Sequence, residues 1–373
     1  MKQRILYTAF LAHLIDDGCE VVLLPLLPLM AKELSFSNAQ IGLIGGVFII
    51  VAGIFQFFTG YISDYIRKKK DLVALGFFLV AAGLTSISLG DSFLWILGGA
   101  SILGVGLSFY HPVGISVVTT HFRTERGRAI GIHGTGGAIG LLLAPAYSGF
   151  VGELWGWRPA LRITAVLCVA VGLLYYFSVK DISFKRSKRK LSVLITPAAI
   201  TVMIVLGLAG MCSRGFSTFF PVRLVRMGYS SGFSGGLLSV FFGMGIFGQY
   251  IGGTLSDRFS HKKVISISLM FTAIFFVPLL RTENTYLLYL FAMITGLFLS
   301  IVWPAIFAYI ADLAPEDMHS RALGVFGTVS AVMSGSAPIM IGYISGVILL
   351  WNALLILPLF SVAGALIMFV MRE

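Results

Sequence analysis

The sequence is short of charged residues and of cysteine. Only 12% of its 373 residues are charged and 57% are hydrophobic, whereas a soluble protein carries about 25% charged residues. This composition excludes an ordinary soluble domain and predicts a membrane protein. The three cysteines, Cys19, Cys168 and Cys212, all lie in apolar runs. They indicate neither a disulfide framework nor a metal-binding spacing, so we expect no metal and no cofactor.

Other familiar signatures are also missing. The glycines between positions 134 and 140 lack the spacing of a dinucleotide or Walker fingerprint and lie within an apolar run. The first apolar run follows Lys2 and Arg4, contains acids and ends without a small-residue cleavage site, so we expect a retained span and no cleaved signal peptide. The net charge of +11 does not predict nucleic-acid binding, because membrane proteins concentrate Lys and Arg in cytoplasmic loops.

Long apolar runs dominate the chain. Each is long enough to cross roughly 30 Å of hydrocarbon, and a segment in lipid must satisfy its backbone groups internally, which favours helices. We therefore predict an all-α membrane protein with twelve transmembrane helices. The predicted spans are 5–31, 39–63, 72–90, 94–119, 128–152, 160–179, 194–222, 235–256, 264–281, 286–311, 321–347 and 350–371.

The basic residues predict the orientation of these spans. With both termini in the cytoplasm, the cytoplasmic segments hold twenty Lys and Arg residues and the outer segments hold six. This asymmetry is typical of the positive-inside rule and predicts a multi-pass protein of the cytoplasmic membrane. The remaining basic residue, Arg214, lies deep within a span rather than near its end.

The chain repeats itself at an offset of 193 residues. The shared features include Asp64 with Asp257, and Ala144-Pro145 with Ala337-Pro338. We predict two six-helix bundles in the same orientation, 1–180 and 193–373, joined by a basic cytoplasmic linker, 181–192. A parallel repeat of this kind is expected of a secondary transporter whose two halves rock against one another. We expect the protein to act as a monomer.

The first predicted helix, Tyr7 to Met30, carries an unusual polar stripe. His13, Asp16, Asp17 and Glu20 have spacings that place them on one helix face. Two carboxylates about 6 Å apart repel by roughly 3 kcal/mol at an effective dielectric constant near 20, so the three acids are not expected to be ionised together unless cations balance them, the candidates being His13, His111 and Arg214. Charges at membrane depth usually mark a pathway or relay. We therefore predict a proton-coupling site here; a static polar cluster or acids exposed to a water-filled cavity are the alternatives.

Polar and aromatic side chains on other helices are candidates for substrate binding. Arg214 is either a counter-ion for the acids or a residue that binds an anionic substrate. His111 is a candidate for titration or for donating a hydrogen bond to substrate. Tyr110 and Trp303 lie beside prolines at nearly equivalent positions of the two repeats, and they are further candidates for substrate contact. His133 is expected to serve helix packing.

Two loop motifs resemble the loop 2–3 signature of the major facilitator superfamily. They run Gly60-Tyr-Ile-Ser-Asp64-Tyr-Ile-Arg67-Lys68-Lys69 and Gly253-Thr-Leu-Ser-Asp257-Arg258. The resemblance implies that each Asp engages the N-terminus of a helix in the opposite half and helps close the cytoplasmic side. A carboxylate gains roughly 0.3–1 kcal/mol at such a position. Arg128 and Arg321, which begin the fifth and eleventh predicted helices, are expected to take part in the same gate.

Two further motifs carry the resemblance. Gly140, Pro145 and Gly149 resemble the antiporter motif of the superfamily, with ordinary helix packing as the alternative. His13-Leu-Ile-Asp16-Asp17, followed by Gly106-Leu-Ser-Phe-Tyr-His111-Pro, resembles the fosmidomycin-resistance-type branch, whose members resemble drug exporters. This branch implies proton-coupled efflux.

These observations predict a proton-coupled antiporter that exports a small drug-like or metabolite molecule by alternating access. Its partners are the substrate, protons and the lipid bilayer. The alternatives are a proton symporter that imports a small organic anion, a membrane-embedded enzyme using the His and Asp cluster, and a non-transporting sensor. We do not expect an enzyme, because the twin loop motifs and the repeat of the whole chain argue against one.

Overall fold

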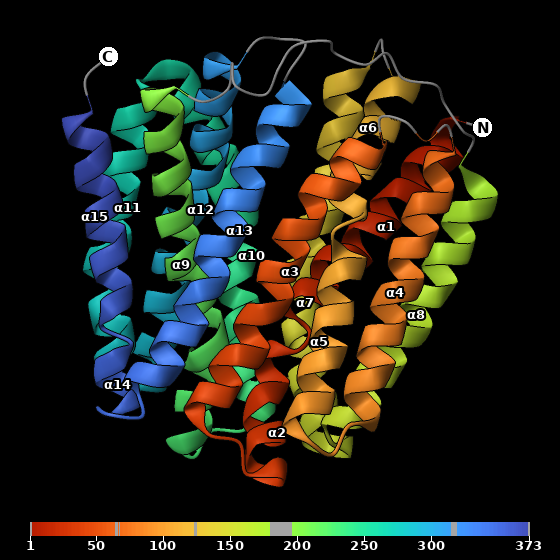
Figure 1. Cartoon of the computed structure of the whole chain (residues 1–373). Coiled ribbons are helices and arrows are strands. Elements are labelled where there is room, and N and C mark those ends of the chain that lie inside the picture. The colour runs from red at the N-terminus through yellow and green to blue at the C-terminus, as the bar shows by residue number, and fades with distance from the viewer. Residues whose placement is uncertain are drawn as a thin grey trace.

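The computed structural model describes residues 2–63, 66, 68–122, 125–179, 196–314 and 319–371. Within these ranges every regular element is a helix (Figure 1), which confirms the predicted all-α class. The first elements are α1 (Lys2–Val21), the 3₁₀ turn η1 (Leu24–Leu26), α2 (Leu27–Leu34), α3 (Asn38–Ser63), α4 (Lys69–Leu89), α5 (Phe93–Leu107), α6 (Tyr110–His121), α7 (Arg126–Trp155) and α8 (Trp157–Ser178). The others are α9 (Pro197–Arg226), α10 (Ser231–Arg258), α11 (His261–Arg281), α12 (Thr285–Leu313), α13 (His319–Ile344), α14 (Leu350–Ala353) and α15 (Ile356–Val370).

Eleven helical stretches in the described part of the chain are long and apolar enough to cross a membrane. They correspond to all the predicted spans except 5–31. The prediction of one continuous helix from Tyr7 to Met30 is wrong, because α1 ends at Val21 and the chain continues as η1 and α2. Pro25 and Pro28 lack the backbone N–H that a continuous helix needs. The polar stripe also leaves α1 without an uninterrupted apolar stretch long enough to cross a membrane.

The predicted span 94–119 is broken as well, between α5 and α6. Pro112 cannot donate a backbone hydrogen bond to the carbonyl of Ser108 one turn earlier. That carbonyl instead accepts a hydrogen bond of 2.7 Å from the hydroxyl of Thr59 on α3. His111 is the second residue of α6 after this break, and α6 packs against α1.

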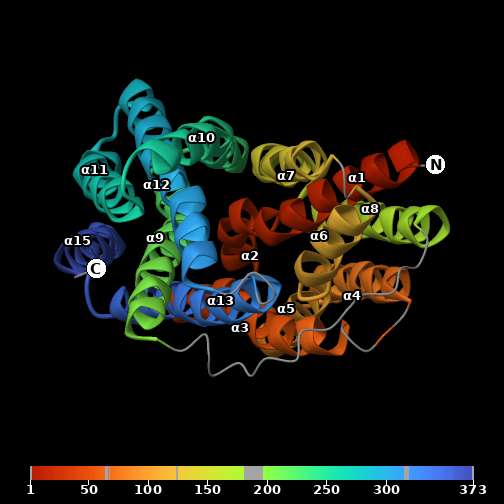
Figure 2. The ribbon, with the colours of Figure 1, turned by 90° about the horizontal axis from the view of Figure 1, so that it is seen from above.

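The helices form two groups side by side. Seen from above, α9 to α15 lie on one side and α1 to α8 on the other, with α3 lying against α13 and α7 against α10 (Figure 2). The two ends of the described chain lie at the same end of the molecule (Figure 1). The predicted linker, 181–192, lies outside the described residues, and the boundaries of the two bundles stay a prediction.

Small residues hold the two groups together at the end far from the termini. A Cβ atom added to Gly46 of α3 would meet the backbone of Gly335 on α13, and one added to Gly235 of α10 would meet the backbone of α7 at Pro145. Hydrogen bonds close the same end, including one of 2.9 Å from the hydroxyl of Ser231 to the carbonyl of Pro25. Backbones approach this closely only where side chains are small.

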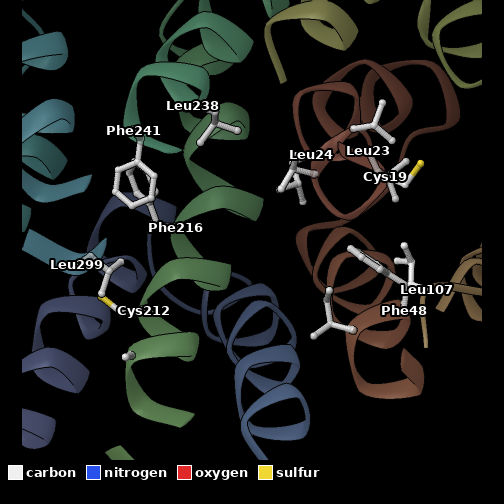
Figure 3. Packing of buried hydrophobic residues seen from close by; sticks show 14 of the residues in the cluster. Cys19, Leu23, Leu24, Phe48, Leu107, Cys212, Phe216, Leu238, Phe241 and Leu299 are labelled. Carbon is white, nitrogen blue, oxygen red and sulfur yellow. The ribbon is translucent and has the colours of Figure 1, made fainter. Parts of the chain in front are cut away.

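Buried apolar residues of both groups form one continuous cluster, part of which is drawn in Figure 3. Phe48 and Leu107 belong to the first group, and Phe216 contacts Phe241 in the second with ring centroids 4.7 Å apart. The three cysteines are buried and free.

The described residues among those predicted to form the gate lie at the end that carries the termini. Asp64 and Arg67 lie outside the described residues, and Arg321 lies on α13 with its side chain undescribed. Lys68, Asp257 and Arg258 are exposed, and a Cβ added to Gly253 would meet no atom of a described residue within 4 Å. Among the described residues, a Cβ added to Gly60 would contact Pro112 alone, and Arg128 pairs with Glu125 at 3.5 Å.

Candidate functional site

The polar stripe of α1 faces inward against α7. An added Cβ on Gly140 would meet the backbone of α1 at Leu14, and one on Gly137 would meet the side chains of His13 and Asp17. These glycines therefore let α7 pack against the stripe itself. The Gly140 part of the predicted antiporter motif contacts α1, whereas Pro145 and Gly149 contact α10.

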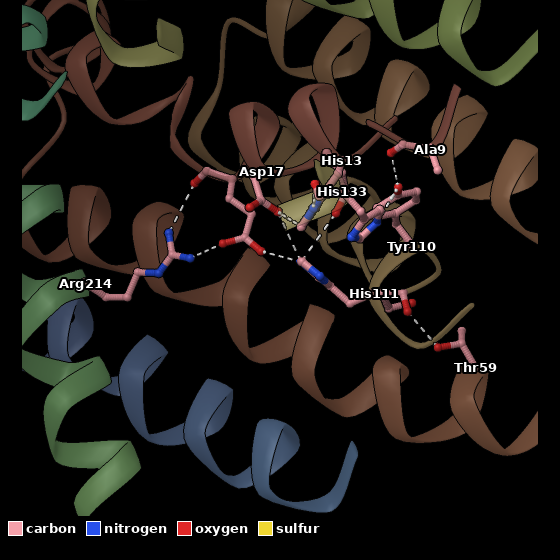
Figure 4. Close-up of polar contacts among 11 residues, drawn as sticks. Ala9, His13, Asp17, Thr59, Tyr110, His111, His133 and Arg214 are labelled. Atoms are coloured by element: carbon pink, nitrogen blue, oxygen red, sulfur yellow. Dashed lines mark hydrogen bonds and ion pairs between the residues drawn. The ribbon is translucent and has the colours of Figure 1, made fainter. Parts of the chain in front are cut away.

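His111 completes the cluster from α6. Its Nε2 atom lies 3.5 Å from Asp16 Oδ2, 3.4 Å from Asp17 Oδ1 and 3.4 Å from Glu20 Oε1. His13 Nε2 lies 3.3 Å from Asp17 Oδ1 (Figure 4). Two histidines and three carboxylates thus converge at one place, and Asp16 is only 2% exposed there.

A second layer of hydrogen bonds orients His13. Its Nδ1 atom lies 2.9 Å from the backbone carbonyl of His133, which can only accept, so Nδ1 carries the hydrogen. The Tyr110 hydroxyl donates to the carbonyl of Ala9 at 2.7 Å and accepts from His133 Nε2 at 3.1 Å (Figure 4). The rings of His13 and His133 stack with centroids 4.2 Å apart. His133 is predicted from the sequence to serve helix packing, and in the structure it also forms hydrogen bonds with His13 and Tyr110.

Arg214 of α9 connects the cluster to the other group of helices. Its Nη2 atom forms an ion pair with Glu20 Oε2, and its Nη1 atom donates to the Glu20 carbonyl at 3.3 Å (Figure 4). The two side chains are 18% and 22% exposed. This places Arg214 as a counter-ion of the helix-one acids, one of the two arrangements that the sequence left open.

A cavity of about 470 Å³ lies between the two groups of helices. Asp17, Glu20 and His111 line one wall, and Arg214 and Trp303 line the other. The α3 lining runs from Ile49 to Gln56, on the terminal side of the close contacts around Gly46.

Tyr110 does not belong to the cavity wall. Its side chain is 2% exposed and lies behind the histidines, so it contacts the cluster rather than the cavity, and its direct contact with substrate stays a prediction. Gln56 and Gln249 line the cavity and were missed. They lie 193 residues apart, so the repeat offset applied to polar residues within spans was the signal that could have found them.

Comparisons with known proteins agree with this architecture. A family model described as Major Facilitator Superfamily matches residues 9–256 and 235–373. An uncharacterized MFS-type transporter of Bacillus subtilis is 25% identical over 88% of this chain and 81% of its own length. The fosmidomycin resistance protein of Escherichia coli is 24% identical over 90% of this chain and 84% of its own length.

Solved structures show the same fold. A bacterial homologue of the human lysosomal transporter Spinster, in an inward-facing and occupied conformation, superposes with a TM-score of 0.86 at 16% identity. The match covers 98% of this chain and 95% of that one. At this identity the likeness concerns the fold alone.

Proposed function

Because the chain belongs to the major facilitator superfamily, we propose that it is a proton-coupled antiporter of the cytoplasmic membrane that exports a small drug-like or metabolite molecule. Membership makes the chain a multi-pass membrane transporter and excludes the enzyme alternative. Proton coupling, exchange and export are the proposal. The observation that carries it is the cavity whose walls bear the acids of α1 on one side and Arg214 on the other.

The proposed coupling is a competition for the acids. Glu20 and Arg214 form an ion pair across the two groups of helices. A proton on Glu20 removes its charge, weakens this link and makes the carboxyl unavailable to a substrate. A substrate that binds the unprotonated acids therefore excludes the proton, and exchange follows if each ligand favours a different facing state.

The cavity suits a small amphipathic substrate. Its volume of about 470 Å³ lies in the range of roughly 300–1,000 Å³ that is typical of small-molecule sites. Phe241, Phe242 and Trp303 supply apolar surface, and Gln56 and Gln249 supply hydrogen-bonding groups. We propose that Trp303 and His111 contact the substrate.

The gating and the orientation complete the proposal. With the termini in the cytoplasm, the close contacts around Gly46 seal the outer end and the cavity faces the cytoplasmic side. In the opposite state, the loop motifs at Asp64 and Asp257 would close that side. The chain would act as a monomer, with bundles 1–180 and 193–373 rocking about the cavity.

Growth and flux measurements test the proposal. An efflux-deficient strain that expresses the protein is first screened against antibiotics and metabolites, with and without an uncoupler. Any protected compound is then followed in proteoliposomes under an imposed pH gradient. A lumen more acidic than the outside should drive uptake by exchange. Glu20→Gln and Asp17→Asn should abolish this gradient-driven uptake, whereas Glu283→Gln, an exposed acid between α11 and α12, should leave it unchanged. Unchanged gradient-driven uptake in both acid variants would refute the coupling role.

Proton symport of a small organic anion is the second candidate, and the place of Arg214 in the cavity wall favours it. A guanidinium binds carboxylate or phosphate groups with two parallel hydrogen bonds. Uptake driven by an outside more acidic than the lumen would replace the antiport proposal with this one.

A further inference from the structure

The cluster on α1 and α6 has the geometry of a metal-binding site. His13, Asp17 and His111 each present one ligand atom, and these atoms all lie within 4.8 Å of one another. We propose that they bind one divalent transition-metal ion of the Zn²⁺ class, with a carboxylate of Glu20 or Asp16 as a further ligand. The sequence predicted no metal, because the donors lie almost a hundred residues apart and only the fold brings them together.

Two of the distances between donors, both from Asp17, match the edges of a coordination shell, and the third pair lies within 4.8 Å. Bonds of about 2.0–2.1 Å to nitrogen and oxygen in a tetrahedral site put neighbouring donors roughly 3.3–3.4 Å apart. Asp17 Oδ1 lies 3.3 Å from His13 Nε2 and 3.4 Å from His111 Nε2. These separations are longer than ordinary charged hydrogen bonds of about 2.7–2.9 Å.

Two carboxylate oxygens in the cluster lack a hydrogen-bond donor. Asp16 Oδ2 and Asp17 Oδ1 are buried and accept no hydrogen bond in the described part of the chain. His111 Nε2 approaches three carboxylates at 3.4–3.5 Å, but one nitrogen carries at most one hydrogen and cannot serve them all. A metal ion binds several such atoms at once.

The second layer of hydrogen bonds fits the same interpretation. The hydrogen on His13 Nδ1 points to the carbonyl of His133, which leaves the Nε2 lone pair of a neutral imidazole facing Asp17. Metal-ligating histidines almost always donate their other N–H in this way. Tyr110 in turn holds His133.

Charge and donor type identify the class of ion. Three ionised carboxylates and Arg214 leave a net charge of −2, which a divalent cation balances. Imidazole nitrogen with carboxylate oxygen suits Zn²⁺, Mn²⁺, Fe²⁺, Co²⁺ or Ni²⁺, whereas Mg²⁺ and Ca²⁺ prefer oxygen alone. Asp17 and His111 line the cavity, which gives the ion a route to the site.

Cobalt binding to the wild-type protein is the first test. Purified, tag-free protein in detergent is titrated with Co²⁺ while its visible absorption and bound-metal content are recorded. We expect one Co²⁺ per chain with a d–d band, displaced by Zn²⁺ but not by Mg²⁺. Absence of stoichiometric binding, or a site that Zn²⁺ does not occupy, would overturn the proposal.

Variants locate the ion. His111→Gln and Asp17→Asn should each weaken Co²⁺ binding by more than the roughly 10- to 100-fold that loss of an outer-shell partner costs. Tyr110→Phe should fall within that smaller range. His121→Gln is the matched control on α6, because its Nδ1 atom bonds the carbonyl of Val117 one turn earlier in the same helix. Unchanged binding in monodisperse His111→Gln and Asp17→Asn proteins would refute the assignment. Binding is measured without a membrane or a gradient, so failure of the transport proposal would leave this result intact.

Discussion

Neutralising Glu20 is the sharpest test of how the two groups of helices are joined. Glu20→Gln keeps the shape of the side chain but removes the charge that pairs with Arg214. The guanidinium keeps its hydrogen bond of 3.3 Å to the Glu20 carbonyl. Arg214 thus stays in place but loses its counter-ion in a partly buried position.

The expected magnitude follows from the exposure of the pair. Exposed ion pairs contribute roughly 0–1 kcal/mol, and removing one partner of a fully buried pair costs about 3–5 kcal/mol. The Arg214 and Glu20 side chains are 18% and 22% exposed. We therefore expect a coupling free energy of about 2 kcal/mol between them.

A double-mutant cycle measures this coupling. The free energy of unfolding in mixed micelles is compared for wild type, Glu20→Gln, Arg214→Gln and the double variant. The double variant should be about 2 kcal/mol more stable than the sum of the single effects predicts. The exposed pair Glu125–Arg128, with side chains 62% and 76% exposed, is the matched control and should show at most about 0.5 kcal/mol. Additive effects of the Glu20 and Arg214 changes would refute the reasoning.

Three further substitutions test the packing that builds the site. Gly137→Ala should disrupt the cluster, because its Cβ would meet His13 and Asp17, whereas a Cβ at Gly134 on the same helix would meet no atom of a described residue within 4 Å. Gly137→Ala should therefore lower the midpoint of thermal unfolding more than Gly134→Ala does, and equal midpoints would contradict this. Thr59→Val leaves the buried carbonyl of Ser108 without its donor, which should cost about 1–3 kcal/mol of unfolding free energy; an unchanged stability would show that the carbonyl finds another partner. Gly46→Ala places a Cβ against the α13 backbone and should cost about 1–3 kcal/mol by overpacking; an unchanged midpoint would mean that this contact is looser than described.

The sequence alone determined the class and the architecture. Membrane helices are specified by local composition, since about 20 consecutive apolar residues suffice, and eleven of the twelve predicted spans recur as membrane-length helices. The acids of α1 were also visible, because charges stand out in an apolar run. Where a prediction concerned one helix and its own residues, local chemistry sufficed.

Helix breaks were harder to predict. The break between α5 and α6 depends on whether a neighbour satisfies the carbonyl that Pro112 leaves free, and Thr59, some fifty residues away, does so. Pro145 and Pro338 lie inside helices that continue through them. Proline alone therefore did not decide where the chain bends.

The candidate site itself was decided by tertiary structure. The sequence placed His13 and Asp17 on one helix face and named His111 on another helix, but it could not say that the three ligand atoms converge, because that depends on how α6 packs against α1. It offered Arg214 two roles, and the structure shows its side chain in an ion pair with Glu20 across the two groups of helices. Sequence periodicity fixes which face of a helix a residue occupies, whereas the packing of helices decides which residues that face contacts. The chemistry of this cavity arises from the packing.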